Sequence, residues 1–168
     1  MSKKASQPQL PAETDFDPSK QATAQLMLHI AQKASQVGSL AGVPLVFAQA
    51  LRASFSPGAA PPFTAAAALR TLAITAAVGT VTLTTLGGVK VAGLDRDGVE
   101  DRVYRIHYNQ GVQRCDRFAN GGALIGGGIV TAVQGARPSA MFGGMAAGTA
   151  LGVLMFATAA SKRDTMRT

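Results

Sequence analysis

Few residues of the types that carry catalysis occur in this chain of 168 residues. Its two histidines, His29 and His107, lie far apart in the sequence, and Cys115 is the single cysteine. No CxxC, HExxH or haem-attachment pattern includes them, so the sequence predicts neither a metal site nor a nucleophilic centre. We therefore expect no enzymatic activity, no cofactor and no small-molecule substrate. Ligation of a haem or chlorophyll by His29 is the alternative, which an optical spectrum of the purified protein would reveal.

A glycine-rich run, GGALIGGG at residues 121–128, is superficially similar to a phosphate-binding loop. Such a loop needs a β-strand before it and a helix after it, because backbone N–H groups at the helix start hold the phosphate. Here the run follows a charged stretch and lies inside a long uncharged window. We interpret it as part of a membrane helix and not as a nucleotide site.

The polar residues of the chain are concentrated between Lys90 and Arg117, where six basic and five acidic residues occur. We predict a polar loop over residues 90–117. Arg114, Asp116 and Arg117 end this segment, directly before an uncharged window. In one interpretation Asp116 favours the dipole of the next helix while the arginines meet lipid headgroups. In the other, Arg114 and Asp116 form a structural ion pair that fastens the loop to the helices.

The formal net charge is +7. The basic residues are scattered at the ends of uncharged windows, and they form no stripe interleaved with aromatic residues of the kind that binds nucleic acid. Charges in such positions anchor helices at lipid headgroups. We therefore expect phospholipid, with cardiolipin among the candidates, and not nucleic acid as a partner.

The elements that must position these residues are long windows without charge. Hydrophobic residues make up 47% of the sequence and charged residues 15%. A helix rises about 1.5 Å per residue, so roughly 20 residues cross the hydrocarbon layer of a bilayer. Windows near this length run from Ala34 to Leu51, Thr71 to Val89, Phe118 to Ala136 and Pro138 to Ser161. The predicted fold class is therefore all-α, an integral membrane bundle of four transmembrane helices, with three spans or a soluble alanine-rich bundle as alternatives.

The predicted organisation has an extended polar tail at residues 1–20, a membrane domain at 21–161 and a basic tail at 162–168. The first tail is too acidic for a mitochondrial presequence and too polar for a secretory signal. Within the membrane domain, the predicted spans cover residues of about 34–54, 68–89, 118–136 and 138–161.

Residues 21–33 have helical periodicity, with Leu26, Ile30 and in some registers Leu28 on one face. This segment is either an interfacial amphipathic helix or a continuation of the first span that protrudes from the bilayer.

The distribution of charge favours an even number of spans. With four spans, one side of the membrane holds 13 of the 16 basic residues and all nine acidic residues. The positive-inside rule then places both termini on the matrix or cytoplasmic side.

Glycines are concentrated in the C-terminal half, and many stand four residues apart. Inside lipid, helices associate through close backbone contact, which glycine permits. We predict that the short connection around Arg137 and Pro138 makes the last two spans an antiparallel hairpin. A single spaced pair is often generic packing, whereas four pairs favour helix association without naming the partner. The predicted helix-packing residues are Gly38, Gly42, Gly122, Gly126, Gly144, Gly148 and Gly152.

The stretch YRxxxNxxxxRxDR, from Tyr104 to Arg117, followed by Gly121, Gly122 and Gly126, resembles a known family. Over residues of about 70–155 the chain is similar to Tim-type translocase channel subunits and outer-envelope amino-acid channels, and to complex I accessory subunits related to them. It departs from the family pattern in a shorter spacing between the acidic residue and the glycine pair, and a closer Arg and Asp. This departure weighs most against a channel, because a channel depends on the geometry of its groove.

The resemblance implies a Tim-translocase-like bundle of four spans in the mitochondrial inner membrane. It also implies a non-catalytic accessory subunit of respiratory complex I, the NADH:ubiquinone oxidoreductase, which supports assembly and stability by packing against other membrane subunits. The alternatives are a pore or translocase-type protein of the Tim-like family and a subunit of another organellar complex such as ATP synthase.

Overall fold

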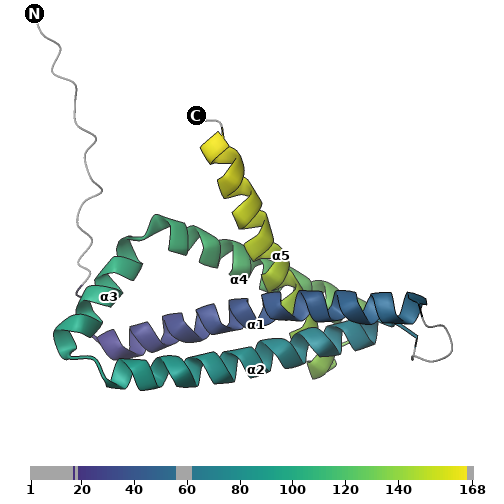
Figure 1. The fold of residues 1–168 in the computed structure, drawn as a ribbon, viewed down its shortest axis with the longest axis horizontal. Coiled ribbons are helices and arrows are strands. Elements are labelled where there is room, and N and C mark those ends of the chain that lie inside the picture. The colour runs from purple at the N-terminus through teal and green to yellow at the C-terminus, as the bar shows by residue number, and fades with distance from the viewer. Residues whose placement is uncertain (1–16, 18, 56–61, 166–168) are drawn as a thin grey trace, which may run out of the picture.

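The computed structural model describes residues 17, 19–55 and 62–165, which form five helices and contain no strand (Figure 1). The all-α class is therefore confirmed for the described residues. The helices are α1 (Ala22–Phe55), α2 (Ala65–Ala92), α3 (Arg96–Tyr108), α4 (Gln110–Gln134) and α5 (Pro138–Thr165).

The two predicted tails lie largely outside the described residues. The first is described only at residue 17 and from residue 19, where Asp17 accepts hydrogen bonds from the backbone and the hydroxyl of Ser19. At the other end, α5 continues to Thr165, so residues 162–165 are helical. The last three residues of the predicted basic tail lie beyond the described part.

Three of the described helices are long and apolar enough to cross a membrane: α1, α2 and the Pro138–Ser161 part of α5. The predicted window 118–136 lies within α4 and the turn after it. Glycines, Asn120 and Gln134 dilute the hydropathy of α4, so it is not among the three. Gly135 ends α4 with a φ of 77°, a backbone conformation that favours glycine.

The first two helices form an antiparallel hairpin and lie side by side (Figure 1). Thr64 caps α2 by accepting a hydrogen bond from the backbone N–H of Ala67 at 3.1 Å. Near the connected end of the hairpin, Gln49 donates to the hydroxyl of Thr71 at 2.9 Å. At the other end of the contact, Ile30 of α1 faces Gly87 of α2.

The last two helices form a second antiparallel hairpin, in which α4 packs mainly on α5. In Figure 1, α5 runs steeply across the α1–α2 pair, and it contacts both of those helices. At the crossing, Gly143 of α5 lies directly against the backbone carbonyl of Leu69 in α2. The second hairpin therefore packs on the first mainly through α5.

The segment predicted as the polar loop 90–117 is helical over most of its length, so this expectation is corrected. Charged residues that suggest a hydrated loop instead form i,i+4 ion pairs along α3, between Arg96 and Glu100 at 2.8 Å and between Asp101 and Arg105 at 3.0 Å. Asp95 caps α3 by accepting from the backbone N–H of Gly98 at 3.1 Å. The ends of α2 and α4 make up the rest of the segment.

Asn109 separates α3 from α4 and begins the second of them. Its side-chain oxygen accepts from the backbone N–H of Val112 at 3.1 Å, which is an N-cap of α4. Its own backbone N–H reaches the carbonyl of Ile106 at the end of α3. Asn109 thus ends the polar helix α3 and begins the glycine-rich helix α4.

From Ala22 onward, the segment predicted at residues 21–33 is part of α1, so it continues the helix of the first predicted span. At this end, Leu26 is buried in a small apolar cluster with Val91, Val99 and Val103, against which Ile30 packs. The cluster joins the start of α1, the end of α2 and one face of α3. In contrast, the side chain of Leu28 is 73% exposed.

Small side chains fill the interior and large apolar side chains lie on the outside, which is the opposite of a soluble domain. Ser39 is the largest fully buried side chain, and most of the buried apolar residues in the helical hairpins are alanines. Large apolar side chains on α1, α2, α4 and α5 point outward, among them Phe47, Val78, Leu124 and Leu151. Such a continuous exposed apolar surface would be unstable in water and is typical of a surface that faces lipid or another membrane helix. Together with the three long apolar helices, it indicates a membrane protein.

Candidate functional site

A close backbone contact joins α4 to α5, where glycines face each other. Gly122 lies opposite Gly148, and Gly126 lies opposite Gly144. A Cβ atom added to Gly148 would collide with the backbone carbonyl of Gly122 and lie 3.2 Å from the Cα of Gly126. One turn further along, Gly152 rests against the backbone carbonyl of Phe118. The structure thus places all five glycines predicted in these two helices in one seam.

A second seam joins α1 to α2 and contains the other two predicted glycines. A Cβ on Gly38 would lie 2.8 Å from the carbonyl oxygen of Thr75, and one on Gly42 would lie 2.9 Å from a methyl carbon of Leu72. Gly79, which the sequence analysis did not single out, faces Gly38 so closely that its own Cβ would lie 2.6 Å from the Cα of Gly38. The signal was present, because Gly79 and Gly87 are eight residues apart and share one helix face.

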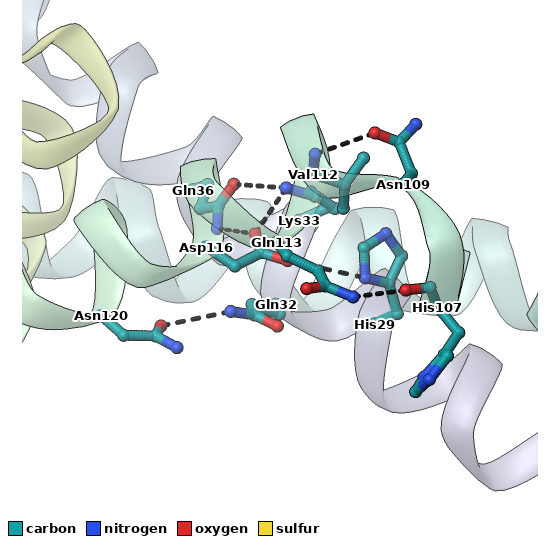
Figure 2. A network of polar contacts seen from close by, with 10 residues as sticks. All are labelled: His29, Gln32, Lys33, Gln36, His107, Asn109, Val112, Gln113, Asp116 and Asn120. Atoms are coloured by element: carbon teal, nitrogen blue, oxygen red, sulfur yellow. Dashed lines mark hydrogen bonds and ion pairs between the residues drawn. The ribbon is translucent and has the colours of Figure 1, made fainter. Parts of the chain in front are cut away.

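A cluster of polar side chains joins α1 to the start of α4, and Asp116 is its centre (Figure 2). Lys33 donates to Oδ1 of Asp116 at 2.5 Å, and the amide of Gln36 donates to the same oxygen at 2.7 Å. Lys33 also donates to the side-chain carbonyl of Gln36 at 3.1 Å. His29 lies 3.9 Å from Oδ2 of Asp116. We call these four residues the Asp116 cluster.

Helical spacing explains why these residues meet. His29, Lys33 and Gln36 follow one another at intervals of four and three residues, so they occupy one face of α1. Gln32 lies beside them and donates to Asn120, one turn beyond Asp116 on α4, at 3.2 Å. The sequence analysis did not predict the α1 half of this cluster. The polar residues at this spacing within an otherwise apolar helix were the available signal.

The Asp116 cluster is largely shielded from solvent. The side chain of Asp116 is 16% exposed and that of Lys33 is 31% exposed, while residue Gln36 is buried. A charge in such surroundings is costly unless it is paired and hydrogen-bonded, and Asp116 has both an ion pair and an amide donor. The pair therefore fixes the position of α4 relative to α1.

Neither predicted role of Asp116 matches this geometry. The helix begins at Gln110, so Asp116 lies in its second turn, beyond the first turn where a helix dipole acts. Its ion-pair partners are Lys33 and His29 of α1, not Arg114. Within the described residues Arg114 and Arg117 are exposed and form no ion pair, so they are available to lipid headgroups.

The ion pair and hydrogen bonds of the Asp116 cluster hold α4 against α1. Among residues 17, 19–55 and 62–165, no three His, Cys, Asp or Glu side chains come together to hold a metal ion. Cys115 is a partly buried free thiol. His107 lies outside the Asp116 cluster, and its backbone carbonyl accepts from the amide of Gln113. The described residues therefore show two glycine seams and the Asp116 cluster.

Replacing Gly148 with alanine is expected to destabilise the protein by about 1–3 kcal/mol, because the backbone of α4 has no room to move away from the new Cβ. Gly128→Ala is the matched control, since a Cβ there meets nothing within 4 Å. That control should raise stability by about 0.5–1 kcal/mol, as alanine is a better helix former than glycine. Thermal unfolding in mild detergent measures the stability of both variants. Equal shifts in melting temperature would contradict a close backbone contact at Gly148.

Replacing Asp116 with alanine is expected to cost about 1–3 kcal/mol, because it leaves the partly buried Lys33 without its anion. Asp101→Ala, which breaks an exposed ion pair of α3, is the matched control and should change the melting temperature little. Replacing both partners, with Lys33→Met and Asp116→Leu, should recover part of the loss. A melting temperature that falls equally for Asp116→Ala and Asp101→Ala would refute a specific role for the cluster.

Comparison with known families gives a match to the family described as protein of unknown function (DUF1757), over residues 14–159. No curated protein matches the sequence. The matched region contains α1 to α4 and most of α5, including both glycine seams and the Asp116 cluster. The chain therefore belongs to the DUF1757 family.

Proposed function

We propose that this protein is a non-catalytic, four-span subunit of a larger membrane complex, which it stabilises by helix packing. One observation carries the proposal: within the described part of the chain, α2 buries only Leu72 and Val91. Its outward side chains over the membrane segment are large and apolar, including Ile74, Val81 and Leu86. A helix left so open in the isolated chain offers a continuous surface to a neighbouring subunit.

The threonines make α2 more polar than a helix that faces lipid on every side. Several of them satisfy their hydroxyls within the helix, as Thr80 does by donating to the carbonyl of Ala76 at 2.6 Å. The hydroxyl of Thr84 is buried and has no hydrogen-bond partner within the described residues. Polar groups of this kind join transmembrane helices through hydrogen bonds.

Four spans, rather than three, follow in this proposal from how α4 packs. Its partner α5 is long and apolar enough to cross a membrane, and α4 runs antiparallel to it along the whole glycine seam. Leu124, Ile129 and Val133 of α4 are exposed and apolar. A helix packed along a membrane span, with such an outer face, belongs in the bilayer with it.

Respiratory complex I, in the mitochondrial inner membrane, is the assembly that we propose. The basis is the resemblance of residues of about 70–155 to accessory subunits of that complex. The seams and the Asp116 cluster support it in a general way, because they make a rigid scaffold without a reaction centre. In this proposal the partners are other membrane subunits and phospholipid, with no nucleic acid and no small-molecule substrate.

A pore or translocase-type activity is the second candidate, and one groove favours it. The groove has a volume of about 650 Å³ and is lined by residues of α1, α2, α4 and α5. Its lining includes polar side chains from three helices, among them Gln36, Asn120 and Thr149. Polar groups between membrane helices can accommodate a polar segment in transit.

After extraction of organellar membranes in mild detergent, the chain should migrate with complex I on a native gel and follow its NADH dehydrogenase activity stain. Migration with ATP synthase would move the proposal to that assembly. Migration as a free species of low mass would refute a subunit role. Ionic or peptide conductance of the reconstituted chain would then favour the pore.

Both termini should lie on the same side of the membrane if α4 spans it, and on opposite sides if only α1, α2 and α5 do. Epitope tags at the two ends, tested for protease accessibility before and after the membrane is opened, distinguish these cases. We expect both tags to be accessible from the matrix side, as the distribution of basic residues predicts. Tags on opposite sides would refute the four-span arrangement.

A further inference from the structure

An apolar groove of about 600 Å³ runs along the outer side of the α4–α5 seam. The backbone of Gly122 and Gly148 forms its floor, because the helices approach too closely there for side chains. Large apolar residues of both helices form its sides, including Ile125, Ile129 and Leu151.

The groove has a positively charged end. Arg117 is the charged residue among those that line it. Arg114 lies three residues earlier on α4 and therefore on the same helix face. Both arginines are exposed, and neither has an ion-pair partner within the described residues. The adjacent carboxylate, Asp116, turns to the other side of α4 and is neutralised by Lys33.

The length of the groove fits a lipid chain. It follows α4 from Arg117 to Ile129, which at 1.5 Å per residue is about 18 Å. One leaflet of a bilayer has a hydrocarbon depth of roughly 15 Å, half of the total thickness. An acyl chain lying in the groove would therefore place its phosphate at the level of the two arginines.

We propose that this groove binds one acyl chain of an anionic phospholipid and that Arg114 and Arg117 hold the phosphate. Guanidinium groups bind phosphate through paired charge-assisted hydrogen bonds. The glycine floor lets the chain contact backbone atoms directly, which increases its dispersion contacts. The proposal rests on the proposed function in one respect, that α4 lies in the bilayer. A partner helix and a second copy of the chain are the other occupants that the test must exclude.

The test uses the full-length chain purified in mild detergent, supplied with phosphatidylglycerol or phosphatidylcholine, and counts retained lipids by native mass spectrometry. One phosphatidylglycerol should be retained in preference to phosphatidylcholine. The Arg114→Gln, Arg117→Gln double variant should weaken this binding about thirty-fold, or about five-fold for each arginine. The double variant Arg96→Gln, Arg105→Gln removes the same charge from α3 and should leave retention unchanged.

Gly121→Leu tests the groove independently of charge. Gly121 lines the groove, and a Cβ there meets nothing within 4 Å, so a larger side chain would begin in open space and extend into the groove. It should abolish retention of phosphatidylglycerol. Gly128→Leu is the matched control, because its Cβ is equally unobstructed and it does not line the groove. If circular dichroism shows that Gly121→Leu unfolds the chain, the arginine variants alone decide whether the groove binds phosphatidylglycerol.

Equal retention of the two lipids, or undiminished retention by both the Gly121→Leu and the arginine variants, would overturn the proposal. So would a Gly121→Leu variant that keeps the lipid but no longer migrates with its complex, since the groove would then hold a partner helix. Dimerisation that Gly121→Leu abolishes while lipid retention persists would assign the groove to a second copy. Loss of the lipid with unchanged migration supports both proposals. Retained lipid in a chain that migrates free of any complex supports the groove and refutes the subunit role.

Discussion

Backbone contact between helices at glycine is the constraint on which the rest of this structure depends. In lipid, apolar side chains gain little by leaving their surroundings, so helices associate through close fit and hydrogen bonds. The seams at Gly122 and Gly148 and at Gly38 and Gly79 supply that fit. Because the interior is filled by backbone and small residues, the large apolar side chains have no place inside and cover the outside.

The two hairpins pack on each other mainly through α5, where Gly143 lies against Leu69 of α2, and two further interactions lie at one end of the bundle. The small apolar cluster around Leu26, Val99 and Val103 connects α3 to the start of α1 and the end of α2. Next to it, the ion pair between Lys33 and Asp116 connects α1 to α4. Both lie where the uncharged windows begin, and both use chemistry that favours a boundary between lipid and water. The glycine seams thus hold each hairpin together, while α5 and the ion pair at the polar end of the bundle join one hairpin to the other.

These two levels of packing leave large apolar surfaces on the outside. The exposed face of α2 carries large apolar side chains, and the groove over Gly122 is a narrow apolar path that ends at Arg117. Asp116 contributes both to the packing of the helices and to the charge of the outer surface. By turning to Lys33 it locks α4 to α1, and it also leaves Arg117 without a neutralising carboxylate. One residue therefore contributes both to the stability of the fold and to the charge of its surface.

The sequence by itself determined the helical class, because uncharged windows of about 20 residues have no other stable form in a membrane. It also pointed to the seven glycines that the structure places in the seams, since a spacing of four residues defines a helix face whatever the partner. Only the tertiary structure decided what the charges do. The many charges between residues 90 and 117 suggested a hydrated loop, but in the structure they form i,i+4 ion pairs along α3. The ion-pair partner of Asp116, Lys33, is 83 residues away in the chain. Local spacing specifies a helix face, but the contact between two faces depends on how distant helices pack, and no local pattern of charge contains that information.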